Sequence, residues 1–179
     1  MRHALNWDKF KALVHYICEK ADDPSVLGSV KLNKVLWYSD VVHFMVHGSP
    51  ITGETYIKRQ RGPVPRNILK ALKELESEQK IRRGKVDFFG YEKNEYIALE
   101  PANKARFTGE EVDIVDGAFR HVCHNHTARS VSEETHDVIW ELADLGEEMP
   151  YETVFAGYVG EVDESDFEWA NGELDSAVA

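Results

Sequence analysis

The sequence of 179 residues has only two cysteines and six prolines, and it lacks any long apolar run. Cys18 and Cys123 both lie in apolar helical patterns, so we expect two buried free thiols rather than a disulfide framework. No stretch approaches the roughly 18 apolar residues of a membrane-spanning helix. The N-terminus lacks the apolar core of a signal peptide. These absences predict a globular cytoplasmic protein with no membrane partner.

Lysine and arginine are missing from the last third of the chain. All 21 of them lie at or before Arg129, whereas 15 of the 32 acidic residues lie from Ser130 onward, and the net charge is -11. This split indicates either internal pairing or a basic partner for the acidic end, and it argues against the whole chain lying on nucleic acid. We expect a folded domain of residues 1–159 followed by a flexible acidic tail of residues 160–179.

Apolar spacing predicts two helices in the first 50 residues. Asn6 is a suitable N-cap for the first, which should stop near Asp22. Ser29 is expected to cap the second, and Gly48 to end it. The expected buried side of this second helix consists of Leu32, Val35, Leu36, Val42 and Met45 or Val46.

The pattern changes between Ile51 and Pro65. A short strand is expected at residues 56–60, followed by an irregular turn at Gly62–Pro65, since proline lacks the backbone donor of regular structure. Pro65 suits the first turn of a third helix. A hairpin should follow, with strands at Lys85–Phe89 and Glu95–Leu99. The expected buried side of the third helix consists of Ile68, Leu69, Leu72 and Leu75.

Two capping boxes, Thr108–Glu111 and Ser130–Glu133, predict two further helices, and Tyr151–Tyr158 a short one. The element order predicts an α+β, mostly α-helical fold: a helical domain with a β-hairpin and a winged-helix-like core. DNA-binding winged helices use a basic third helix and a basic hairpin. A winged-helix DNA-binding transcriptional regulator is therefore the alternative function.

No arrangement of residues predicts catalysis. The sequence has neither a paired nucleophile and base nor a glycine-rich phosphate loop. The run His121–His126 contains zinc-type ligands, and His136 or a carboxylate could add a fourth, but the spacing matches no usual ligand pair. Cys123 aligns with Phe119 as a core position. We therefore expect no enzyme, no cofactor and no metal.

The segment Lys31–Asp40 combines apolar residues with charged and aromatic ones. Asp40 falls on a partly buried helix face, and a buried carboxylate needs a hydrogen-bond donor. The stiff basic loop Lys58–Pro65 is expected to supply it.

This segment resembles the Lys-Leu-x-Lys-Leu-Leu-Tyr-(Tyr/Phe)-(Ala/Ser)-Asp signature of the Panacea domain, the SocA-like antitoxin family. His47–Glu54 is similar to its Gly-x-Pro-(Ile/Leu)-Thr-Gly segment, and Gly62–Pro65 to its Gly-Pro-Val-Pro turn. Weaker likenesses extend the resemblance to roughly residues 7–158. Val35 and Trp37 depart from the more usual Leu and Tyr. The matching residues, expected to be mainly structural, are Lys31, Leu32, Lys34, Leu36, Trp37, Tyr38, Asp40, Gly53, Gly62, Pro63, Val64, Pro65, His136 and Trp140.

The resemblance implies a non-catalytic antitoxin that neutralises a cognate toxin by direct contact. One branch of the family is described as an adaptor that delivers its toxin to a cytoplasmic protease. Residues 176–179 are similar to C-terminal signals for bacterial unfoldases. Charge complementarity suits the acidic tail to a toxin with a basic cleft. The expected partner-binding residues are Arg59, Arg61, Arg66, Phe167 and Trp169.

Overall fold

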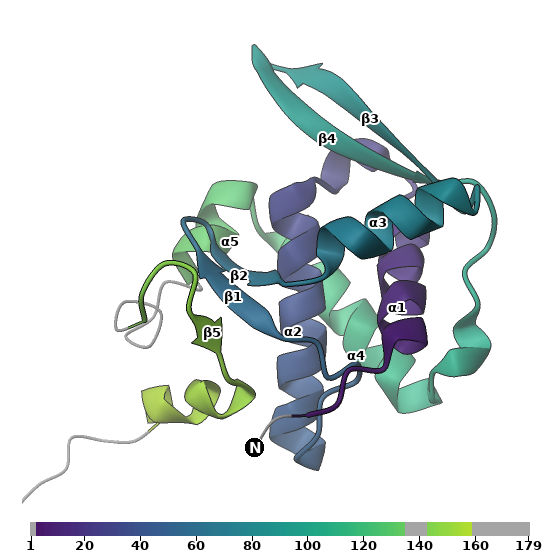
Figure 1. Ribbon diagram of the computed structural model, residues 1–179. Helices are drawn as coiled ribbons and strands as arrows, with labels where there is room; N and C mark the ends of the chain where they lie inside the picture. Colours follow the sequence, from purple (N-terminus) through teal and green to yellow (C-terminus); the bar gives the residue numbers. More distant parts are fainter. Residues whose placement is uncertain (1–2, 135–142, 159–179) are drawn as a thin grey trace, which may run out of the picture.

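The computed structural model describes residues 3–134 and 143–158 (Figure 1). It confirms the α+β, mostly helical class. His136, Trp140 and the tail with Phe167 and Trp169 lie outside the described residues. The α-helices are α1 (Trp7–Lys20), α2 (Ser29–His47), α3 (Ile68–Ser77), α4 (Gly109–Arg120) and α5 (Ala128–Glu134). The other helical segments are the 3-10 helices η1 (Pro24–Val26), η2 (Lys104–Arg106) and η4 (Tyr151–Tyr158), the last of them predicted as a short helix, and the π-helical η3 (His121–Asn125). The strands are β1 (Tyr56–Arg59), β2 (Gly62–Pro65), β3 (Ile81–Phe88), β4 (Tyr91–Ala98) and β5 (Glu148–Met149).

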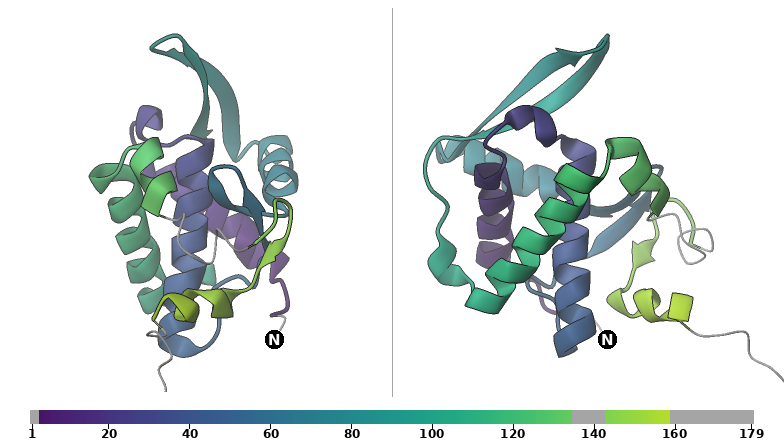
Figure 2. Two further views of the ribbon diagram at one scale, coloured as in Figure 1. Left: turned by 90° about the vertical axis from the view of Figure 1, so that its left-hand side faces the viewer. Right: turned by 180° about the vertical axis from the view of Figure 1, so that it is seen from behind.

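Helix α2 runs through the middle of the molecule. Helix α4 covers one of its sides, and β1, β2 and α3 lie on the opposite side (Figure 2). The expected ends of α2 are partly right. Gly48 closes it in the left-handed conformation, but the N-cap is Gly28, and the Ser29 hydroxyl instead contacts the Tyr96 hydroxyl at 2.8 Å.

The expected buried side of α2 holds only in its first half. Leu32, Val35 and Leu36 are fully buried, but the prediction for Val42, Met45 and Val46 is wrong, because all three are exposed. The core follows Trp37, Val41 and Phe44 instead. In the last turns of α2 the packed side is the one where Phe44 contacts Tyr151 and Phe155 of η4, with ring centroids 5.6 and 5.8 Å apart. Val42, Met45 and Val46 lie on the other sides of the helix, which face solvent.

The small sheet has the order β2-β1-β5, with all pairs antiparallel. The prediction of an irregular turn at Gly62–Pro65 is wrong, since these residues form β2. Proline is tolerated there because β2 lies at the sheet edge. Arg66 donates its backbone N–H inward to Thr55 at 2.8 Å, and alternate residues share a direction, so the nitrogens of Pro63 and Pro65 face outward.

Pro65 therefore ends a strand instead of starting a helix, and α3 begins at Ile68. Ile68, Leu72 and Leu75 are buried as expected, together with Ala71. Leu69 was predicted to be buried, but its side chain is 73% exposed.

The hairpin is longer than expected and has a tighter turn. The loop predicted at residues 90–94 is mostly strand β4, and only Phe89 and Gly90 form the turn, with φ of 51° and 83°. Positive φ at both central residues is the geometry that matches strand twist in two-residue hairpins. The hairpin stands away from the body (Figure 1). It holds Phe89, 88% exposed, and Tyr91 at its tip.

The second half begins as predicted with the Thr108–Glu111 capping box. The prediction of a capping box at Ser130–Glu133 is wrong, because α5 begins at Ala128. At its start, the backbone N–H of Thr127 donates to the Ser130 hydroxyl at 3.0 Å, and the backbone N–H of Ser130 donates to the Thr127 hydroxyl at 3.1 Å. Cys18 and Cys123 are buried free thiols, as expected. Within residues 3–134 and 143–158, no helix has the length and apolarity needed to cross a bilayer.

Two glycines with similar dihedral angles allow a stability prediction. Gly48 and Gly53 have φ of 69° and 71°, but only a Cβ at Gly53 would overlap a backbone atom, the carbonyl oxygen of Ala4. We expect Gly48→Ala to lower the free energy of unfolding by about 1 kcal/mol and Gly53→Ala by about 3 kcal/mol. Urea denaturation of both variants checks this, and equal losses would contradict it.

Candidate partner-binding groove and its buried support

A buried carboxylate joins α2 to the segment before β1. Asp40, fully buried, accepts hydrogen bonds from the backbone N–H of Thr52 at 2.8 Å, the Thr52 hydroxyl at 2.6 Å and the Tyr56 hydroxyl at 2.8 Å. The expectation that the basic loop supplies the donor is therefore wrong. Burial raises the pKa of Asp40 above its ordinary value, with the three hydrogen bonds opposing the change.

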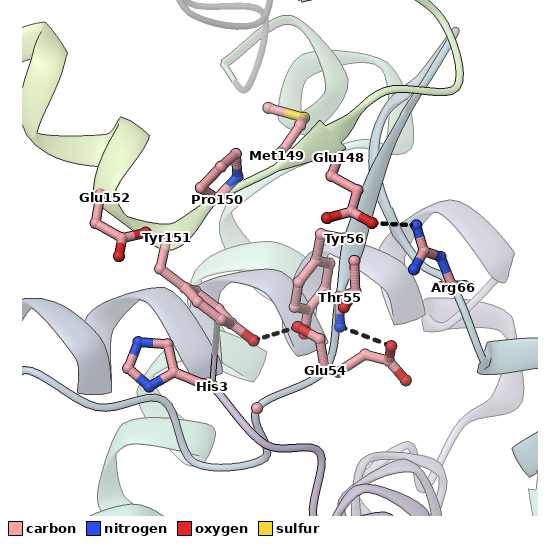
Figure 3. A pocket seen from close by; sticks show the side chains of 11 residues that line it. His3, Glu54, Thr55, Tyr56, Arg66, Glu148, Met149, Pro150, Tyr151 and Glu152 are labelled. Atoms are coloured by element: carbon pink, nitrogen blue, oxygen red, sulfur yellow. Dashed lines mark hydrogen bonds and ion pairs between the residues drawn. The ribbon is translucent and has the colours of Figure 1, made fainter. Parts of the chain in front are cut away.

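A second buried carboxylate lies beside a cavity of about 490 Å³ between β1, β5 and η4 (Figure 3). Glu54 accepts from the Thr55 N–H at 2.7 Å and from the Asn67 amide at 3.0 Å. Its other oxygen has no partner among the described residues. Burial raises the pKa of Glu54. Arg66, expected to bind the partner, pairs with Glu148 at 2.6 Å on the cavity rim.

Most family-motif residues lie inside the protein. Trp37 contacts Tyr56 edge-on and stacks on Tyr151, with ring centroids at 4.9 and 6.3 Å. The Lys31 ammonium donates to the carbonyl of Cys123 at 3.1 Å. Lys34, at 1% exposure, is buried. These positions hold α2 against β1 and η3.

An open groove runs between the base of the hairpin, α3 and the β1–β2 turn. It consists of three adjoining hollows of about 410, 520 and 410 Å³, and each of them includes Ser29 at the start of α2. The groove is fixed at its hairpin side, because Asn94 donates to the Ser29 hydroxyl at 2.7 Å. Its principal lining residues are Arg59, Arg61, Val64, Leu69, Leu72 and Leu145.

The groove combines exposed apolar side chains with uncompensated positive charge. Leu69 and Leu145 are largely exposed. In the part of the chain that the structure describes, neither Arg59 nor Arg61 makes an ion pair. By contrast, Arg83 pairs with Glu76, and Lys85 with Glu92 at 2.7 Å. The groove therefore suits a partner with apolar side chains and carboxylates.

Sequence reasoning identified the two arginines of the groove but missed its apolar residues. Leu69 was assigned to the core because it shares helical spacing with Leu72. Phe89 was placed at the end of a strand, whereas it occupies the exposed turn. The sequence offered no clear signal for this turn, because Phe-Gly is not among the dipeptides that favour two-residue hairpins, and the positive φ of Phe89 is seen only in the structure.

The predicted histidine and cysteine cluster is divided in the structure. Cys123 is buried in the core, as its alignment with Phe119 indicated. His124 packs edge-on against Phe119, with ring centroids 5.7 Å apart. His121 and His126, five residues apart, lie on the same side with centroids 4.6 Å apart.

The raised pKa of Asp40 predicts a pH dependence. As the pH falls, the Asp40 carboxylate becomes protonated at a higher pH in the folded state than in the unfolded state, where its pKa is near 3.8. As the pH falls from about 7 to about 4, the wild type should therefore gain stability relative to Asp40→Asn, by about 1.4 kcal/mol for each unit of pKa difference. Denaturation of both proteins across this range checks the sign, and a loss of wild-type stability relative to Asp40→Asn as the pH falls would contradict it.

Comparison with known families gives one match. Residues 32–141 match the family model described as Antitoxin SocA-like, Panacea domain. No curated protein and no solved structure matches the chain. The matched range includes Asp40, its donors and the β1–β2 turn, and it covers more than half of the sequence. The chain belongs to the SocA-like antitoxin family, whose domain is the Panacea domain.

Proposed function

We propose that this protein is the antitoxin of a toxin–antitoxin pair and that it neutralises its cognate toxin by direct binding in the groove. Membership of the family supports an antitoxin-type role. One observation carries the proposal: the exposed Leu69 lies in the same groove as Arg59 and Arg61, and neither arginine has an ion-pair partner in the described structure. The protein needs no catalysis for this role.

The groove has the composition of a binding surface. Interfaces concentrate their binding energy in a few aromatic, arginine and large apolar side chains surrounded by a polar rim. Leu69 on α3 provides an apolar anchor, and the two arginines provide the rim. Phe89 and Tyr91 at the hairpin tip extend the surface outward. A partner that fills the groove and touches the tip would bury all of these residues.

The groove walls are held before any partner arrives. Lys93 of the hairpin donates to the carbonyl of Ser25, and the Tyr96 hydroxyl contacts the Ser29 hydroxyl. A preformed surface loses less conformational entropy on binding. Two routes to neutralisation are compatible with such a surface: covering the toxin's active site, or presenting the bound toxin to a cytoplasmic protease.

The charge distribution disfavours the regulator alternative. Helix α3 carries Lys70 and Lys73 on its outer side, but also Glu74 and Glu76. Glu76 pairs with Arg83 of the hairpin. A recognition helix that contacts phosphates needs cations that carboxylates on the same helix do not offset. A salt-dependent shift of a promoter fragment at low protein concentration would nevertheless favour a regulator.

Variants of the groove test the proposal. Leu69→Asp and Arg59→Glu should each weaken toxin binding at least 30-fold, on the order of 2 kcal/mol, because each places an acidic group where a carboxylate-bearing partner docks. The measurement is survival on co-expression with the toxin from the adjacent gene, together with the dissociation constant of the purified pair.

Val46→Asp is the matched control. Val46 is 64% exposed at the other end of α2, so the same change of chemistry there should leave neutralisation intact. All three variants should keep the wild-type melting temperature, since they alter exposed side chains. Wild-type neutralisation by both groove variants would remove the groove from the mechanism.

The acidic tail, residues 160–179, is a second proposed contact. It carries Phe167 and Trp169 among seven acidic residues. If it docks on a basic toxin cleft, its deletion should weaken binding at least tenfold and reduce the salt dependence of the affinity. Double substitution of Phe167 and Trp169 by Ala should weaken binding while retaining the charge. Unchanged neutralisation after deletion would exclude the tail.

A further inference from the structure

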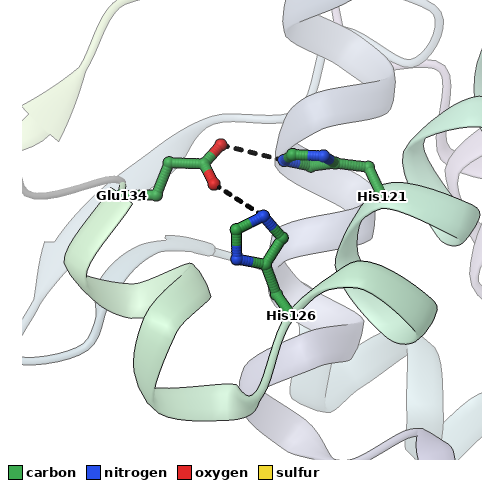
Figure 4. A group of neighbouring side chains, drawn as sticks. All are labelled: His121, His126 and Glu134. Carbon is green, nitrogen blue, oxygen red and sulfur yellow. Dashed lines mark hydrogen bonds and ion pairs between the residues drawn. The ribbon is translucent and has the colours of Figure 1, made fainter.

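We propose that His121, His126 and Glu134 form a zinc-binding site that fastens the end of α5 to the π-helical turn after α4. Figure 4 shows the two imidazole rings and the carboxylate pointing toward one another. The Nε2 atom of His121 lies 2.9 Å from Oε1 of Glu134, and Nε2 of His126 lies 3.0 Å from Oε2. All three ligand atoms lie within 4.8 Å of one another.

The π-helical turn explains why the two histidines converge. Residues five apart on an α-helix point about 140° apart, because the helix turns once in 3.6 residues. Here α4 widens into η3 over His121–Asn125, and His126 is extended, with φ of -126° and ψ of 149°. This local change returns the His126 ring to the side of His121. Single π-helical turns occur frequently at functional sites.

Outer contacts orient each candidate ligand. The Ser130 hydroxyl lies 3.1 Å from Nδ1 of His126, which leaves Nε2 directed at Glu134. The Tyr38 hydroxyl donates to Oε1 of Glu134 at 2.6 Å. The Tyr38 ring also packs edge-on against His121, with centroids 5.3 Å apart. Metal sites use contacts of this kind to fix ring orientation and carboxylate position.

The donor set indicates the metal. Two imidazole nitrogens and one carboxylate suit tetrahedral Zn²⁺ and leave its fourth position to water, whereas Ca²⁺ and Mg²⁺ prefer oxygen ligands. Zn–N bonds of about 2.0–2.1 Å place tetrahedral ligands roughly 3.3 Å apart. The observed 2.9 and 3.0 Å would need the carboxylate to move by only a few tenths of an ångström. The partial exposure of all three side chains gives the ion a route in.

A bound ion would also steady one wall of the groove. The Ser132 hydroxyl of α5 donates to the backbone carbonyl of Arg61 at 3.2 Å. Fixing Glu134 at the end of α5 therefore restrains the β1–β2 turn. The zinc site itself stands on its own geometry and does not depend on the proposed function.

Calorimetric titration of the chelator-treated full chain with Zn²⁺ tests the proposal. The wild type should bind one ion per chain, and His126→Ala and Glu134→Gln should abolish stoichiometric binding. Tyr38→Phe keeps the ligands and should weaken binding about tenfold. Visible absorption after Co²⁺ substitution should show a tetrahedral site in the wild type but not in His126→Ala or Glu134→Gln.

His47→Ala is the matched control. His43 and His47 form another close imidazole pair, with centroids 4.4 Å apart, and His47 lies 3.1 Å from Glu110. Zinc binding should be unchanged in this variant. The assignment would be overturned if the wild type failed to bind Zn²⁺. It would also be overturned if His126→Ala and Glu134→Gln bound Zn²⁺ as tightly as the wild type, or if His47→Ala lost binding. Circular dichroism of every variant establishes that a lost signal does not reflect unfolding.

Discussion

The buried carboxylate of Asp40 is the interaction on which the surrounding architecture depends. A carboxylate removed from water is strongly destabilising unless hydrogen bonds replace its hydration. Thr52 and Tyr56 supply all three described donors; Thr52 lies in the segment that leads into β1, and Tyr56 is the first residue of β1. Because these donors must meet Asp40, the position of β1 relative to α2 is fixed. Strands β2 and β5 then pair on either side of β1, and the turn bearing Arg59 and Arg61 follows from that placement.

Sequence patterns predicted the fold where the chemistry is local. The Asn6 cap, the glycine at position 48 and the Thr108 capping box each depend on a few neighbouring residues, and each is present. Predictions failed where the outcome depends on distant elements. Periodicity marks an apolar stripe but not the point where packing partners end, so Val46 and Leu69 were wrongly placed inside. Proline excludes a central strand but not an edge strand, which is why β2 was missed.

In the candidate site too, features that depend on neighbouring residues could be predicted from the sequence, and features that depend on distant elements could not. Arg59 and Arg61 could be proposed from residue type, since charge on a short turn is usually exposed. Their lack of ion pairs in the described structure depends on where Glu76 and Glu148 lie, which no local pattern gives. The donors to Asp40 were sought among cations, whereas the structure uses a backbone amide and two hydroxyls. The meeting of His121 with His126 depends on a π-helical turn, and regular helical spacing conceals it.

The two prolines of β2 limit how anything can attach to this side of the protein. An exposed sheet edge normally offers a row of backbone N–H and C=O groups that another chain can extend as an added strand. At positions 63 and 65 the outward-facing nitrogens carry no hydrogen, so this edge lacks the donors for β-augmentation. The edge is therefore protected from fibre-like self-association. The partner proposed for the adjoining groove would then be recognised through side chains, and its specificity would depend on the residues at a few exposed positions.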